Sequence, residues 1–85
     1  MVADDDPKEL ERSARVLENS GYRVVSATDG RTALQEALTR RVDLIIMDVS
    51  IPQLSGVEPC HWPGLFENVP RVMLLNRFTS NWWTW

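Results

Sequence analysis

Residues 44–56 read LIIMDVSIPQLSG, and the rest of the chain is organised around this stretch. Four apolar residues in a row, bounded by Asp43 and Asp48, are typical of a strand in a parallel sheet, where helices bury both faces. Asp48 stands at the carboxyl end of this strand, which is where open α/β sheets place their ligand sites. Pro52 and Gly56 then turn the chain away from the sheet. Asp48 is therefore the first candidate for a reacting group.

The segments before this strand alternate between extended and helical patterns. A short apolar stub, residues 1–3, is followed by residues 8–19, whose apolar side chains recur at the spacing of a helix. Gly21 is placed to end that helix in a left-handed conformation. Residues 22–27 then predict a short strand, and residues 31–40 a second helix. The order strand, helix, strand, helix, strand predicts a parallel sheet with right-handed crossovers.

Beyond the organising stretch the pattern is weaker. Pro59, Pro63 and Gly64 stand where a third crossover helix would have its middle, so any helix there is short or broken. Residues 72–75 form another apolar run, which predicts a fourth buried strand. Residues 76–85 contain three tryptophans in a tail rich in Thr, Ser and Asn, with no assignable period.

Composition excludes several classes of protein. The 85 residues carry a net charge of -3 and no cluster of basic residues, which argues against a nucleic-acid-binding surface. Cys60 is the single cysteine, so there is no internal disulfide framework, and a reducing compartment fits. No signal peptide is visible, and no apolar run approaches the roughly 20 residues of a membrane span. We expect a cytoplasmic chain that binds neither nucleic acid nor membrane.

Three consecutive carboxylates follow the N-terminal stub. Asp6 precedes Pro7 and suits the N-cap of the first helix. That role leaves Asp4 and Asp5 unexplained, because further carboxylates beside a cap are costly without a cation. Two readings stay open from these residues alone, a metal site and a group of solvated loop acids.

Acidic residues after a first strand, Asp48 after a third, and the spacing Asp-x-x-x-Pro-x-x-x-Gly form a recognisable set. With these motifs the chain resembles the receiver domain of bacterial two-component response regulators. The resemblance covers residues 2–56 well and residues 69–75 loosely. It also includes the family-like segments Gly-Tyr-Arg-Val at residues 21–24 and Ala-Thr-Asp-Gly at residues 27–30.

The resemblance implies a fold and a domain organisation. The expected fold is α/β, an incomplete flavodoxin-like parallel sheet in the order 2-1-3-4 with helices on both faces. Residues 1–85 are expected to form a single domain. Residues 1–56 are family-like, whereas residues 57–85 diverge and lack the family's last strand and helices.

The resemblance also implies a role for each site residue. Asp48 matches the phosphoacceptor, which takes a phosphoryl group from a histidine of a partner kinase or phosphotransfer protein. Asp5 matches the direct Mg²⁺ ligand, Asp4 the ligand that acts through water, and Ser50 the residue whose backbone carbonyl completes the metal site. Asn76 stands nearest to the family's phosphoryl-contacting Thr or Ser. Such a domain is a signalling module rather than an enzyme, although slow self-catalysed phosphotransfer is compatible with it.

Physical chemistry agrees with these roles. Three carboxylates in one pocket repel each other, and a hard divalent cation with oxygen ligands relieves that repulsion. The same cation offsets the charge that develops when a carboxylate attacks phosphorus in line.

Two departures from the family leave other functions open. Leu75 and Asn76 stand where the family has Thr or Ser, and the family's lysine after a fifth strand has no counterpart, because Lys8 is the only lysine. One alternative is a pseudo-receiver that binds protein partners without phosphotransfer. Another is a fragment without independent function.

The apparent loss of a fifth strand also predicts self-association. It would leave residues 72–75 as an apolar, uncharged edge strand, which invites pairing with another chain. Either the tail folds back with Trp82, Trp83 and Trp85 over the exposed core, or it leaves an apolar patch. The sequence favours self-association, as a strand-paired or swapped dimer, over a monomer whose tail closes the fold.

Overall fold

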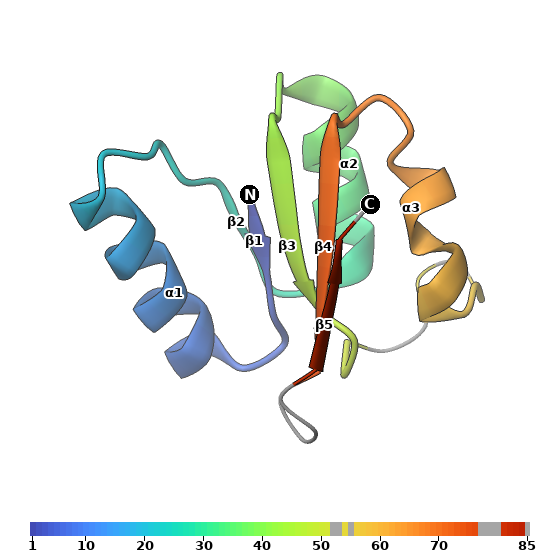
Figure 1. Ribbon diagram of the computed structural model, residues 1–85, viewed down its shortest axis with the longest axis horizontal. Helices are drawn as coiled ribbons and strands as arrows, with labels where there is room; N and C mark the ends of the chain where they lie inside the picture. The colour runs from blue at the N-terminus through green and yellow to red at the C-terminus, as the bar shows by residue number, and fades with distance from the viewer. Residues whose placement is uncertain (52–53, 55, 77–80, 85) are drawn as a thin grey trace.

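The computed structural model describes residues 1–51, 54, 56–76 and 81–84. In this part of the chain, strands and helices alternate along the first half, and two strands follow a short helical segment (Figure 1). The elements are β1 (Val2–Ala3), α1 (Pro7–Asn19), β2 (Ser26–Ala27), α2 (Gly30–Thr39), β3 (Leu44–Asp48), the 3-10 turn η1 (Pro59–His61), α3 (Trp62–Leu65), β4 (Arg71–Asn76) and β5 (Asn81–Thr84).

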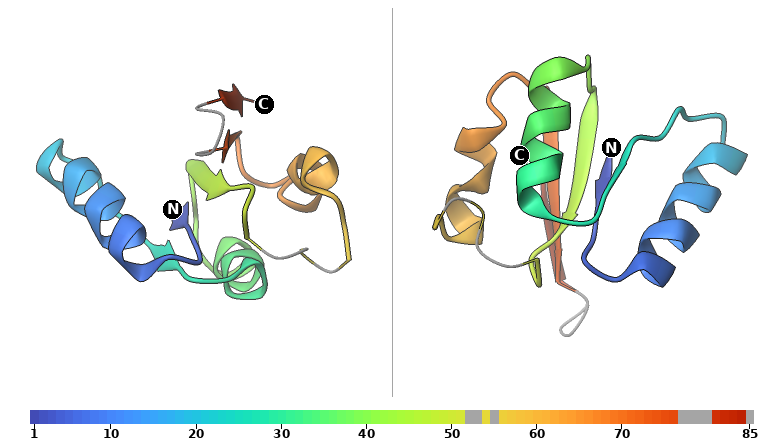
Figure 2. Two further views of the ribbon diagram at one scale, coloured as in Figure 1. Left: turned by 90° about the horizontal axis from the view of Figure 1, so that it is seen from below. Right: turned by 180° about the vertical axis from the view of Figure 1, so that it is seen from behind.

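The strands form one sheet in the order β2-β1-β3-β4-β5. The first four are parallel, so the predicted order 2-1-3-4 is confirmed. Figure 2 shows α1 on one face of the sheet and α2 and α3 on the other, as expected for a flavodoxin-like arrangement.

β5 corrects the prediction that β4 is an edge strand. It pairs with β4 in antiparallel register, from Met73 opposite Thr84 to Asn76 opposite Asn81. Only four residues connect the two strands, and so short a connection suits an antiparallel pair, since parallel neighbours need a crossover of about a dozen residues or more. This strand was not predicted, because residues 76–85 taken together show neither the alternation of a strand nor the period of a helix.

The helix boundaries follow from local capping. Asp6 caps α1, as predicted, and its carboxylate accepts a hydrogen bond from the backbone N–H of Lys8 at 3.0 Å. Gly21 follows α1 with φ of 93°, which confirms the predicted left-handed residue. Asp29 caps α2 by accepting from the N–H of Thr32 at 2.7 Å, and this hydrogen bond lowers the pKa of the Asp29 carboxyl.

Some elements are shorter than the sequence suggested. β2 contains only Ser26–Ala27 of the predicted strand 22–27, because β1 offers only two residues for it to pair with. The third helix is short, as the prolines predicted, with η1 leading into the four-residue α3.

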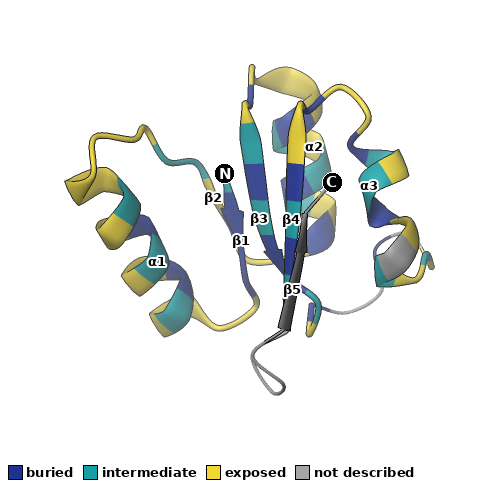
Figure 3. Ribbon diagram, viewed as in Figure 1, coloured by how far each residue is buried: buried dark blue, intermediate teal, exposed yellow. Residues whose placement is uncertain are grey.

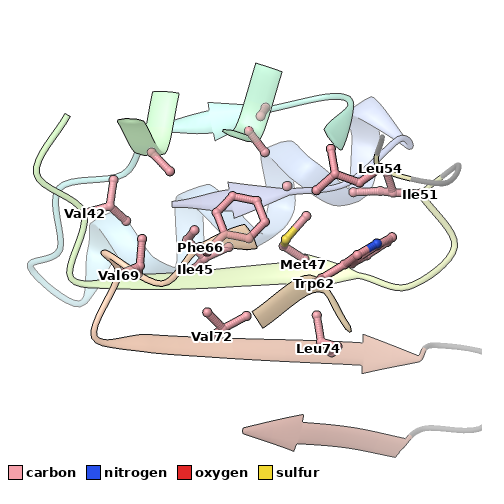
Figure 4. Packing of buried hydrophobic residues seen from close by; sticks show 14 residues of the cluster. Val42, Ile45, Met47, Ile51, Leu54, Trp62, Phe66, Val69, Val72 and Leu74 are labelled. Atoms are coloured by element: carbon pink, nitrogen blue, oxygen red, sulfur yellow. The ribbon is translucent and has the colours of Figure 1, made fainter. Parts of the chain in front are cut away.

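The hydrophobic core lies between the sheet and the two helices α2 and α3 (Figure 4). Ile45 and Met47 of β3 and Val72 and Leu74 of β4 alternate toward this side and are fully or almost fully buried. Trp62 of α3 is also fully buried, and its indole N–H donates to the Val57 carbonyl at 2.9 Å. This tryptophan therefore belongs to the core.

The opposite face of the sheet is less covered. α1 packs against β1 and β2 at one side of this face. Ile46, Met73 and Leu75 point to the same face from β3 and β4 and are only half-buried, unlike their neighbours along the strands (Figure 3). A groove therefore runs beside α1, with this apolar strip as its floor.

Candidate functional site

Two acidic side chains meet at the carboxyl ends of neighbouring strands. β1 and β3 are parallel, with Ala3 opposite Met47, so that Asp4 and Asp48 come next in line on the two chains. Side chains alternate between the faces of a sheet. Because Ala3 and Met47 belong to the core on the α2 side, Asp4 and Asp48 are directed to the face that carries α1.

Both carboxylates are buried, which is unusual for acidic residues. Asp4 is 2% exposed and Asp48 5% exposed, and they are the only charged residues that are buried in the described part of the chain. They line one groove of about 510 Å³, together with Glu9 and Arg12 of α1 and the apolar strip of the sheet. The groove is the one place in the described structure where buried charge meets a space that a ligand can enter.

Backbone hydrogen bonds hold each carboxylate in place. The N–H of Asp6 donates to Asp4 Oδ1 at 3.0 Å, and the N–H of Ser50 donates to Asp48 Oδ1 at 2.9 Å. Each bond joins a carboxylate to the N–H two residues on, the geometry of an Asx turn. The loops that follow β1 and β3 therefore fix the orientation of the two acids.

The structure separates the predicted site residues into two groups. Asp4 and Asp48 come together in the groove, whereas the side chains of Asp5 and Ser50 are exposed. The backbone of Asn76 ends β4, but its side chain lies outside the described residues, as do Pro52 and Trp85. Among the side chains that are described, no group of three His, Cys, Asp or Glu residues is placed to hold a metal ion.

The donor set still fits a magnesium ion. Mg²⁺ keeps several waters and is usually bound through one or two carboxylates together with substrate phosphates, rather than by a cage of protein ligands. The buried oxygens of Asp4 and Asp48 supply a pair of this kind at one end of the groove.

Sequence reasoning gave no role to the residues that α1 contributes to the groove. Glu9, Arg12, Ser13 and Val16 recur at helical spacing and line it together. The signal was present, because these positions belong to the helix that directly follows the acidic triplet. They were interpreted only as parts of an amphipathic helix, with Ser13 and Val16 on or beside its apolar side and the charged residues opposite.

Comparison with known proteins identifies the family. A family model described as the response regulator receiver domain matches residues 1–78. The chain belongs to this family. Receiver domains are signalling modules of two-component systems, so the resemblance seen in the motifs is confirmed.

The relatives of this receiver domain are longer proteins. The alkaline phosphatase synthesis transcriptional regulatory protein PhoP of Bacillus subtilis is 43% identical over 60 residues, which cover 71% of this chain and 25% of PhoP. The uncharacterized transcriptional regulatory protein YrkP of the same organism is 35% identical over 80 residues, or 94% of this chain and 34% of YrkP.

The polar-differentiation response regulator DivK of Brucella anthropi is 34% identical over 62 residues, covering 73% of this chain and 50% of DivK. The chain thus spans between a quarter and a half of these three relatives. No solved structure is a significant match. Over the described residues, none of the helices has the length and apolar character needed to cross a membrane.

Proposed function

We propose that Asp48 accepts a phosphoryl group from a phosphohistidine of a kinase or phosphotransfer protein, as one step of a two-component phosphorelay. The observation that carries this proposal is the pair of buried carboxylates, Asp4 and Asp48, facing one groove at the carboxyl end of the sheet. The match to the receiver-domain family supports a role in phosphoryl transfer. The proposed location is the cytoplasm, where the phosphohistidine of a kinase would be accessible to this domain.

The proposed reaction is an in-line displacement at phosphorus. An Asp48 carboxylate oxygen forms the new O–P bond while the P–N bond to the donor imidazole breaks, and the imidazole leaves as the neutral ring after taking up a proton. The N–H of Ser50 donates to Asp48 Oδ1 at 2.9 Å and so fixes the orientation of the attacking carboxylate. Burial restricts the carboxylate to one orientation, so little conformational freedom remains to be lost during the attack.

Asp5, Asp48 and the Ser50 carbonyl are proposed to ligate Mg²⁺, and buried Asp4 is proposed to hold the ion through water, as the family resemblance implies. When bound, the ion neutralises charge on the phosphoryl oxygens. Asn76 is kept as the proposed phosphoryl contact from the end of β4.

Acetyl phosphate with Mg²⁺ tests the proposal directly. We expect the intact chain to gain one phosphoryl group by mass spectrometry and the Asp48→Asn variant to gain none. Asp43→Asn is the matched control, because Asp43 directly precedes the same strand β3 but is exposed at its opposite end. Equal labelling of the Asp48→Asn variant and the parent would rule out Asp48 as the acceptor.

A pseudo-receiver that binds partners without phosphotransfer is the second candidate function. It is favoured by the finding that the described side chains bring two carboxylates together rather than three. A parent chain that folds, binds Mg²⁺ and yet stays unlabelled at high acetyl phosphate would favour this alternative.

A further inference from the structure

We propose that Arg12 of α1 is the cation that contacts the phosphoryl group on Asp48, an inference that rests on the proposed function. Arg12 lines the same groove as Asp4 and Asp48. It is the only basic residue among those that line this groove in the described structure. The other charged members, Asp4, Glu9 and Asp48, are all acidic, so the groove without Arg12 would strongly disfavour an anionic phosphodonor.

The direction of the Arg12 side chain supports this role. Side chains of a helix point back toward its N-terminus, and the N-terminus of α1 directly follows Asp4 and Asp5. The guanidinium Nη1 of Arg12 lies 3.5 Å from the Glu9 carboxylate, one turn nearer to that end. Arg12 is thus already turned toward the carboxyl end of the sheet, where Asp48 lies.

The contact with Glu9 leaves Arg12 available. The Arg12 side chain is 74% exposed, and its bond to Glu9 is a long surface ion pair. Such pairs contribute little net stability, because water screens them and both side chains lose rotamer freedom. A phosphoryl group offers a guanidinium two oxygens at once, which is a stronger partner than one screened carboxylate oxygen.

The charge of Arg12 has opposite effects on the two ligands of the site. A guanidinium near Asp4 and Asp48 attracts an anionic phosphoryl group and repels Mg²⁺. Removal of Arg12 should therefore slow phosphorylation and strengthen Mg²⁺ binding. A residue that merely supported the fold would weaken both when it was removed.

Arg15 provides a matched control on the same helix. It is also an exposed arginine in an ion pair, with Glu11 at 2.6 Å, but it does not line the groove of Asp48. Arg12→Ala, Arg12→Lys and Arg15→Ala would be compared with the parent chain. The readouts are the labelling rate with acetyl phosphate at saturating Mg²⁺, binding of the phosphoryl analogue fluoroberyllate, and Mg²⁺ titration by tryptophan fluorescence.

We expect Arg12→Ala to lower the labelling rate about tenfold, the low end for a charge-assisted contact because the side chain is exposed. Its Mg²⁺ affinity should rise roughly twofold, as expected for the loss of a screened neighbouring charge. Arg12→Lys should recover part of the rate, since it keeps the charge but not the two-pronged geometry. Fluoroberyllate binding should weaken in Arg12→Ala and stay unchanged in Arg15→Ala.

Three results would overturn the inference. The first is a labelling rate of Arg12→Ala within about twofold of the parent. The second is an equal loss of labelling rate in Arg12→Ala and Arg15→Ala. The third is a fall of both the labelling rate and the Mg²⁺ affinity in Arg12→Ala. If the parent itself neither accepts phosphoryl nor binds fluoroberyllate, the proposed function fails and Arg12 loses its role with it. A labelled parent with an unaffected Arg12→Ala variant removes the inference alone.

Discussion

At the scale of single residues, alternation along the strands decides which acids face the groove. Asp4 and Asp48 each stand one position beyond a core residue, so both face the groove beside α1 and both are buried. Asp5 follows Asp4 directly and is exposed. Asp4 and Asp5 therefore lie in different environments, although the sequence of the triplet alone does not distinguish a buried acid from an exposed one.

This difference predicts unequal effects on Mg²⁺ binding. Asp4→Asn should weaken Mg²⁺ binding about tenfold or more. Groups that hold the directly bound ligands of a metal in place typically contribute roughly 10–100-fold to its affinity. Asp5→Asn should weaken Mg²⁺ binding as well, because the family resemblance implies that Asp5 ligates the metal directly. Titration followed by tryptophan fluorescence measures both, with Asp6→Asn as a control because Asp6 is occupied as the α1 cap. Mg²⁺ affinities that are unchanged in both Asp4→Asn and Asp5→Asn would contradict the metal site.

At the scale of elements, the loop after β3 and the start of α2 fit against each other. Gly30 is buried at the first position of α2, and a Cβ built there would lie 2.8 Å from Leu54 Cδ1 and 3.2 Å from Leu54 Cβ. Leu54 is itself 2% exposed and belongs to the hydrophobic core. The absence of a side chain at Gly30 is thus what lets the loop that follows Asp48 close onto α2.

Gly30→Ala should destabilise the fold by about 1–3 kcal/mol, the usual cost of overpacking a core contact. Gly64→Ala is the matched control, because Gly64 also lies in a helix but a Cβ there meets nothing within 4 Å. That substitution should be neutral or stabilising by up to about 1 kcal/mol, through the higher helix propensity of alanine. Urea unfolding measures both. Equal stabilities of the two variants would show that Leu54 moves aside without cost.

At the scale of the whole molecule, the tail changes how the sheet ends. β5 covers the edge of β4 over residues 73–76, so the backbone groups that were expected to recruit a second chain are paired within this one. The reason given for a dimer through β4 is therefore wrong. The side chains of β5 lie outside the described residues, and the backbone of Trp82 and Trp83 stands opposite Leu75 and Leu74 of β4.

Removal of residues 77–85 should promote association through β4. The shortened chain would expose β4 as an apolar edge strand, which is prone to pair with another copy. We expect its sedimentation coefficient to rise with concentration, while that of the full chain stays nearly constant over the same range. A shortened chain that remains monomeric at every concentration would show that β5 does not protect this edge.

The strand order 2-1-3-4 was implied by the family resemblance. The sequence by itself determined the parallel sheet, the Asp6 cap of α1, and Asp48 as the candidate acceptor. These features depend on local patterns: apolar runs, capping residues, and the position of an acid after a strand. Only the tertiary structure decided that Asp4 and Asp48 are buried in one groove beside α1, that Arg12 faces the same groove, and that the tail adds a strand to β4. Each of these joins segments that are distant along the chain, and the register between strands and the packing of α1 on the sheet are set by contacts that no local pattern encodes.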